Sequence, residues 1–143
     1  MIRTAICRCG GCAIDIDGEP TVNLICHCTS CKRRTGGPCG WSAIFRADQV
    51  SDRRGDFKVY NSDGTAGRVT NSFCSRCGTS LFFVSADFPG LIGCAGGCFV
   101  DVPLGEPTVS ASDDLRCAWL RLPDAWEVRT SDMAEAGRPR DTA

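Results

Sequence analysis

The sequence predicts one mainly β domain, and three observations support this. Glycine and proline together make up about 16% of the 143 residues (16 and 7 residues), above the average of about 12%, which favours a turn-rich chain. The apolar segments are short, as in Leu81–Val84. Several segments alternate apolar and polar residues, as half-buried strands do. A transmembrane helix needs about 20 apolar residues, so none is expected.

The first half of the chain predicts strands separated by cysteine-rich turns. The segment Cys12–Gly18 alternates apolar and acidic residues and ends at a glycine, which is typical of a half-buried strand before a turn. Ser30–Thr35 favours one helical turn, because the Gly36–Pro38 segment would stop it. Ala47–Ser51 favours a turn or a short helical piece. Strands are expected over Met1–Ile6, Cys12–Gly18, Val22–Cys26 and Trp41–Phe45.

The second half predicts a strand at Phe57–Tyr60, followed by a turn at Asn61–Gly64. Gly67–Phe73 and Thr79–Ser85 favour a hairpin, with the intervening Cys-x-x-Cys segment at its tip.

The C-terminal part is expected to contribute to the core and then to become disordered. Leu115–Leu122 is apolar and aromatic enough to pack, and Trp119 is predicted to lie in the core. From about Thr130 the chain is polar and of mixed charge. We therefore expect a domain over residues 1–128 and a disordered tail over 129–143.

Charge and composition exclude several classes of protein. Sixteen Lys and Arg against 17 Asp and Glu give a net charge of −1, which argues against a nucleic-acid-binding protein. A hydrophobic content of 43% excludes a fully disordered chain. Met1–Cys7 has neither a long apolar core nor a small-residue cleavage site, so we expect no secretory signal, no membrane partner and a reducing, cytoplasmic location.

The twelve cysteines point to metal binding, because disulfides are rare in a reducing compartment. Seven of them form three short clusters, which are Cys7-Arg8-Cys9, Cys26-His27-Cys28-Thr29-Ser30-Cys31 and Cys74-Ser75-Arg76-Cys77. A structural zinc takes four ligands, and two short pairs from distant parts of the chain can supply them. The set Cys7, Cys9, Cys74 and Cys77 therefore predicts a structural zinc site.

The remaining cluster has three cysteines, Cys26, Cys28 and Cys31, and three protein ligands are typical of a catalytic zinc with one open position. An alternative stays open, in which another cysteine supplies a fourth ligand and makes this site structural too. The candidates for that ligand are Cys12, Cys94 and Cys98. His27, the only histidine, is expected not to be a ligand, since adjacent residues rarely coordinate one ion. Burial as small apolar side chains is the expectation for Cys12, Cys39 and Cys117.

The order and spacing of the three clusters resemble the glutathione-dependent formaldehyde-activating enzyme family, also called the centromere-protein-V-like domain. The best-matched stretch is Phe73–Thr79, with its Phe-Cys-x-x-Cys-Gly pattern. The resemblance implies an Mss4-like fold of several coiled antiparallel sheets stapled by the structural zinc. It also implies a second zinc at Cys26, Cys28 and Cys31, where a substrate thiol or water takes the fourth position.

The activity that the resemblance implies is that of a carbon–sulfur lyase. In that reaction glutathione condenses with formaldehyde to S-hydroxymethylglutathione, or the adduct is cleaved. A thiolate is the attacking species, and zinc can both generate it and hold the aldehyde oxygen. Lys32-Arg33-Arg34 follows the three-cysteine cluster and could bind the carboxylates of glutathione, although a solvated surface turn is the simpler interpretation.

Two other functions fit the same residues. The protein could be a non-catalytic zinc-binding interaction module in which only the structural zinc is present. It could also be a thiol redox sensor that forms a disulfide among Cys26, Cys28 and Cys31. The sequence leaves the true substrate, the occupancy of the second site and the oligomeric state open.

Overall fold

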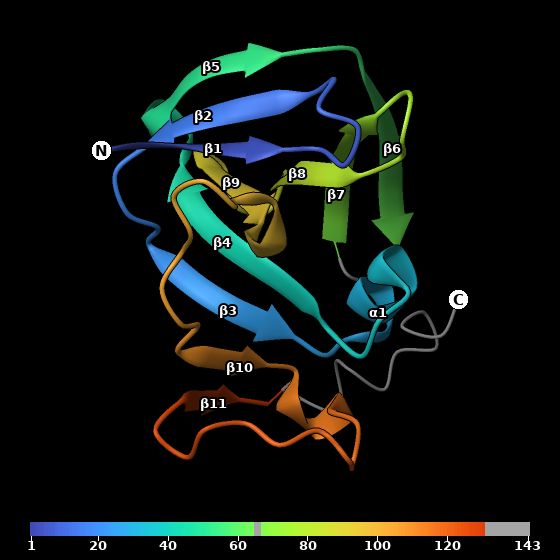
Figure 1. The fold of residues 1–143 in the computed structure, drawn as a ribbon. Helices are drawn as coiled ribbons and strands as arrows, with labels where there is room; N and C mark the ends of the chain where they lie inside the picture. The colour runs from blue at the N-terminus through green and yellow to red at the C-terminus, as the bar shows by residue number, and fades with distance from the viewer. Residues whose placement is uncertain (65–66, 131–143) are drawn as a thin grey trace.

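The computed structural model describes residues 1–64 and 67–130 and confirms the mainly β prediction (Figure 1). The described residues form two sheets, one short helix α1 (Thr29–Thr35) and three 3-10 turns, η1 (Ala47–Gln49), η2 (Gly96–Cys98) and η3 (Asp113–Leu115). None of the helices in this part of the chain is long and apolar enough to cross a membrane.

The smaller sheet has three antiparallel strands in the order β1-β2-β5. These strands are β1 (Ile2–Ile6), β2 (Ala13–Asp17) and β5 (Val50–Arg54). The alternation predicted for β2 is present, because Ile14 and Ile16 are fully buried. Asp15, between them, points to the other face and pairs with Arg54 at 2.7 Å.

The larger sheet has eight strands in the order β11-β10-β3-β4-β9-β8-β7-β6. Most neighbours are antiparallel, as expected, but β10 runs parallel to both β3 and β11. Figure 1 shows the smaller sheet above β4 and β9, with β10 and β11 at the opposite end of the molecule. The strands are β3 (Val22–Cys26), β4 (Gly40–Arg46), β6 (Phe57–Gly64), β7 (Gly67–Cys74), β8 (Ser80–Ser85), β9 (Leu91–Ala95), β10 (Val109–Ala111) and β11 (Glu127–Arg129).

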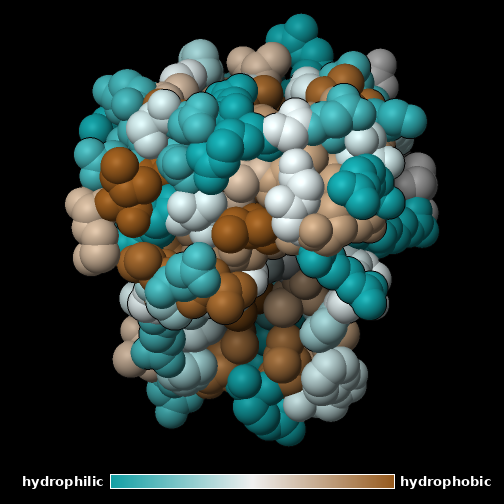
Figure 2. Space-filling model, turned by 45° about the horizontal axis from the view of Figure 1, so that its top comes forward, coloured by the Kyte–Doolittle hydropathy of each residue, from teal (hydrophilic) through white to brown (hydrophobic). Residues whose placement is uncertain are grey.

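The core lies between the two sheets. Ile14 and Ile16 of the smaller sheet belong to one buried cluster with Phe45, Leu81 and Ile92 of the larger sheet. Burying a side chain of this size contributes roughly 1.5–3 kcal/mol. The outer surface is of mixed hydropathy, and Figure 2 shows hydrophobic groups spread among hydrophilic ones on this face.

Two predictions about strands and turns need correction. The turn predicted at Asn61–Gly64 is wrong, because β6 continues through these residues in register with β7. The pairing of β6 with β7 also gives the Asn61 side chain a hydrogen-bond partner, since the Thr70 hydroxyl donates to Asn61 Oδ1 at 2.8 Å. The turn predicted over Ala47–Ser51 covers η1 but also the start of β5, a strand that was not predicted. In both places backbone pairing with a neighbouring strand outweighs local turn propensity.

Trp119 was predicted to lie in the core, and this is wrong, because the side chain is 68% exposed. It belongs to a loop of turns between η3 and β11, which is the edge strand of the larger sheet. A loop at a sheet edge is covered on one side only.

The disordered tail predicted over 129–143 begins at the last residue of β11, Arg129. Residues 131–143 lie outside the described residues.

Candidate metal centre

Four cysteines from distant parts of the chain form the four-cysteine cluster, which is Cys7, Cys9, Cys74 and Cys77. Two of them follow β1 and the others stand at the turn between β7 and β8. Their Sγ atoms all lie within 4.8 Å of one another. The Cys7–Cys9 and Cys9–Cys74 sulfur distances are 3.6 and 3.7 Å. A tetrahedral zinc with bonds of about 2.3 Å separates its sulfurs by about 3.8 Å, whereas a disulfide is about 2.05 Å long. The four donors therefore fit a zinc ion.

The turns that present these cysteines direct backbone N–H groups at the sulfurs. Gly10 and Gly78 both adopt a positive φ, +79° and +77°, which lets each turn close tightly. The amide of Cys12 donates to Cys7 Sγ at 3.2 Å, and the amide of Arg76 donates to Cys74 Sγ at 3.4 Å. Backbone hydrogen bonds from Cys77 and Arg76 lower the pKa of the Cys74 thiol and so favour the thiolate, which is the form that binds metal.

Cys77, the residue after Arg76, receives similar support. Its Sγ lies 3.2 Å from Thr79 Oγ1. The hydrogen bonds from the Thr79 hydroxyl and backbone lower the pKa of the Cys77 thiol to about 5. This thiol is therefore poised to be a thiolate at neutral pH.

The three-cysteine cluster, Cys26, Cys28 and Cys31, stands where β3 ends and α1 begins. Its three Sγ atoms also lie within 4.8 Å of one another, and all three residues are partly buried. Cys28 is the N-cap of α1, and its Sγ accepts a hydrogen bond from the amide of Cys31 at 3.3 Å. Hydrogen bonds from the Cys26 and Cys31 thiols, and from the amides of Cys31 and Ser30, lower the pKa of Cys28.

Among the described residues, no fourth Cys, His, Asp or Glu belongs to the three-cysteine cluster. The alternative in which Cys12, Cys94 or Cys98 completes it is therefore wrong. Cys12 is buried beside the four-cysteine cluster, as its amide contact with Cys7 shows. Cys94 is fully buried in β9. Three cysteines were expected to be buried. Cys12 is buried, whereas Cys39 and Cys117 are only partly buried.

His27 is turned away from both cysteines that flank it. The side chain is fully buried, and its Nε2 lies 2.9 Å from Ser110 Oγ. Ser110 donates its hydroxyl hydrogen to Asp113 Oδ1 at 2.7 Å, so it accepts from the Nε2–H of His27. Burial lowers the pKa of His27, which keeps the ring neutral. His27 Nδ1 is buried without a partner in the described residues.

This His27–Ser110–Asp113 chain ties the three-cysteine loop to β10 and to η3. The parallel pairing of β3 with β10 places Cys26 opposite Ala111, and the amide of His27 donates to the Ala111 carbonyl. Ser110 and Asp113 were not predicted from the sequence as part of this loop. They are more than 80 residues away along the chain, and the residues between follow no motif that indicates the contact.

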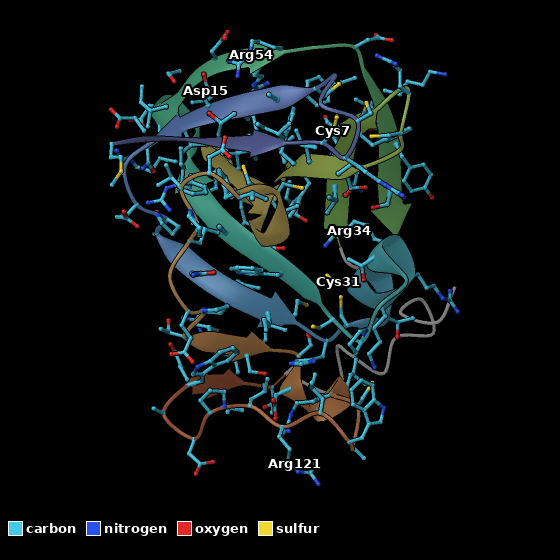
Figure 3. The ribbon with its side chains drawn as sticks, viewed as in Figure 1. Cys7, Asp15, Cys31, Arg34, Arg54 and Arg121 are labelled. Atoms are coloured by element: carbon cyan, nitrogen blue, oxygen red, sulfur yellow. The ribbon has the colours of Figure 1, made fainter. Side chains whose placement is uncertain are left out.

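The basic run after the cluster divides into three different environments. Lys32 Nζ donates to the carbonyl of Leu115 at 2.6 Å and so supports the fold. Arg33 is exposed. Arg34 is partly buried and lies with Cys31 on the side of α1 that faces the start of β4 (Figure 3).

Gly40, the first residue of β4, makes room for this arrangement. A Cβ at this position would lie 2.7 Å from Arg34 Nη2 and 3.2 Å from Cys31 Cβ. The first separation is too short for any side chain without movement of the arginine. The glycine therefore leaves room for the Arg34 guanidinium between α1 and β4.

The fold and the two clusters define a mainly β protein with two cysteine sites of metal-binding geometry. The model of one family, "Glutathione-dependent formaldehyde-activating enzyme", matches residues 2–113, and the chain belongs to this family. The resemblance inferred from the cysteine motifs is thereby confirmed.

Comparison with solved structures supports the fold. A crystal structure of a Rhodobacter sphaeroides protein is similar with a TM-score of 0.53 and 22% sequence identity. The match covers 66% of this chain and 85% of the other. Among the curated proteins searched, none matches the chain.

Proposed function

We propose that the protein is a zinc-dependent carbon–sulfur lyase that acts on a small thiol adduct, of the S-hydroxymethylglutathione synthase type. The observation that carries the proposal is the three-cysteine cluster, with three convergent thiols and no fourth ligand in the described residues. In this proposal Cys7, Cys9, Cys74 and Cys77 hold a structural zinc, and Cys26, Cys28 and Cys31 hold a catalytic one. The family match supports an activity on glutathione and formaldehyde.

The reaction that fits this site adds a thiol to a carbonyl. A carbon–sulfur bond forms, and the thiol proton ends on the former carbonyl oxygen, so that the adduct is a hydroxymethyl thioether; cleavage is the reverse. Zinc bound at the three cysteines would supply an open position for a thiolate and would polarise the aldehyde oxygen. In this reaction the Cys31 amide would stabilise Cys28 as a thiolate, because its N–H donates a hydrogen bond to Cys28 Sγ.

His27 is not part of this chemistry. Both of its ring nitrogens are buried, one against Ser110 and one without a partner in the described residues. A general base must lie within hydrogen-bond reach of the proton that it accepts. In the proposed function His27 therefore supports the loop and does not exchange protons with substrate.

A cytoplasmic location is part of the proposal. All twelve cysteines are free thiols in the structure, and thiols persist in a reducing compartment.

The test is whether zinc-loaded protein accelerates formaldehyde release from S-hydroxymethylglutathione over the buffer blank. The Cys28→Ser variant should lose the acceleration and retain one zinc per chain where the native protein holds two. No acceleration by the native protein carrying two zinc ions would contradict the proposal.

The second candidate is a non-catalytic zinc-binding interaction module. It is favoured by the observation that, within residues 1–64 and 67–130, no His, Asp or Glu joins the three cysteines. One zinc per chain in protein purified under reducing conditions would favour this function.

A further inference from the structure

A hollow of about 360 Å³ is lined by Arg34, which follows the three-cysteine cluster in α1. It is bordered by α1, β4, the turn of the four-cysteine cluster and η2, through Arg34, Trp41, Thr79, Ser80 and Gly97. This volume is within the range of about 300–1,000 Å³ that is typical of small-molecule sites. The lining includes one cation and no acidic residue.

Arg34 is available to a ligand. It makes no hydrogen bond or ion pair with any residue in the described parts of the chain, unlike Lys32, which is bound to Leu115. It is also only partly exposed, so its position is restricted by its neighbours. A guanidinium of this kind can bind a carboxylate through two parallel N–H groups.

The guanidinium is close to the cluster. Arg34 Nη2 and Cys31 Sγ lie 2.7 and 3.5 Å from one point, the position that a Cβ on Gly40 would take. The two atoms are therefore no more than about 6.2 Å apart. A small thiol with a carboxylate a few bonds from its sulfur can reach both.

Trp41 provides the apolar side of the same hollow. A Cβ on Gly96 would lie 2.4 Å from the Trp41 ring, so the ring packs directly on the backbone of η2. Trp41 Nε1 is also fixed by a 2.7 Å hydrogen bond to Asn23 Oδ1. The ring is thus a rigid surface for the aliphatic part of a ligand.

Another hollow, of about 420 Å³, shares Thr79 and Gly97 with the first among its lining residues. Arg8 lines it, and its lining also contains no acidic residue. Each hollow is therefore lined by an arginine and by no acidic residue, which favours a ligand that carries negative charge.

We infer that the proposed site selects a thiol that carries a carboxylate, and that Arg34, which lines the hollow and lies near Cys31, is the residue that binds this carboxylate. The inference rests on the proposed function, because the thiol sulfur must be held at the three cysteines. It divides the basic run into one substrate-binding residue, Arg34, one structural residue, Lys32, and one solvated residue, Arg33.

The experiment uses cobalt-loaded protein and a matched pair of thiols, N-acetylcysteine and its amide, which differ by one carboxylate. Binding is measured from the change in cobalt absorption as each thiol is added. We expect the native protein to bind the acid at least about ten-fold more tightly than the amide, a difference of about 1.4 kcal/mol. Arg34→Met should remove this preference, and Arg34→Lys should keep part of it.

Arg33→Met is the control, because it removes the same charge from the next residue of the same helix. It should bind both thiols as the native protein does. If Arg34→Met keeps the native preference, or if the native protein binds acid and amide equally, the assignment of Arg34 is wrong while the proposed function stands. If neither thiol changes the cobalt absorption of the native protein, both the proposed function and this inference fail.

Discussion

The two cysteine clusters differ in where their residues come from. The four-cysteine cluster joins residues 65 positions apart, and two of its members, Cys7 and Cys74, belong to the buried core. The three-cysteine cluster comes from one six-residue segment at the end of β3 and the start of α1, and its three cysteines are partly buried. The first cluster can stabilise the whole fold, whereas the second is local. The same residue type therefore serves two different purposes.

The largest expected effect tests this difference directly. Cys74→Ser should destabilise the protein far more than Cys26→Ser, because a structural zinc contributes on the order of 10 kcal/mol of folding free energy. We expect Cys74→Ser to lose cooperative unfolding and Cys26→Ser to retain it. Thermal unfolding of both variants, with zinc per chain measured on the same samples, checks this. Equal shifts in melting temperature would mean that the two clusters are not divided as proposed.

The next largest effect is expected from loss of the His27–Ser110 hydrogen bond, which holds the loop of the three-cysteine cluster in place. Ser110→Ala leaves the buried Nε2–H of His27 without its acceptor, which costs roughly 1–3 kcal/mol of stability. Because His27 lies between Cys26 and Cys28, the zinc affinity of this cluster should fall while that of the four-cysteine cluster stays the same. Competition with a chelator measures both affinities. Ser51→Ala, at an exposed serine of β5, is the control and should change neither.

A smaller effect is expected at Gly40. Gly40→Ala places a methyl group 2.7 Å from Arg34 Nη2 and 3.2 Å from Cys31 Cβ, so the arginine must move. Since its guanidinium is the far end of a flexible side chain, the fold should persist with a slightly lower melting temperature. The three-cysteine cluster should bind zinc more weakly. Gly105→Ala, where an added Cβ meets nothing within 4 Å, should behave as the native protein.

The smallest effect is expected in the smaller sheet, away from both clusters. The hydrogen bonds from Arg54 and from the Thr4 hydroxyl hold the pKa of Asp15 below its usual value of 3.8. The ionised carboxylate therefore stabilises the fold above about pH 4, and this contribution is lost as the pH falls through the lowered pKa. Asp15→Asn should be slightly less stable than the native protein at pH 7. Urea unfolding at several pH values should show the difference shrinking toward pH 3; a difference independent of pH would contradict this account.

Much of the fold was predictable because its signals are local. The strand over Val22–Cys26 was predicted with the observed bounds, and the hairpin of β7 and β8 was predicted with its cysteine turn. Gly36 ends α1 with a φ of +71°, as a glycine after a helical segment indicates. The alternation of β2 likewise follows from its own residues, Ile14 and Ile16.

Three features were not predictable from local signals. Asn61–Gly64 has turn residues, but pairing with β7 extends β6 through them. Trp119 is as apolar as a core residue, but its loop lies at a sheet edge. The parallel pairing of β10 with β3 depends on a contact between segments more than 80 residues apart.

Within each short cysteine segment the sequence already places the sulfurs close together, because a turn of two or three residues leaves them little freedom. The order of these segments also indicates the family. The long-range contacts come from the tertiary structure: it places Arg34 near Cys31 and Trp41 while Arg33 is exposed, and it sets Ser110 and Asp113 against His27. These contacts depend on how α1, β4 and β10 meet, and such long-range packing follows from the whole core and not from any one segment.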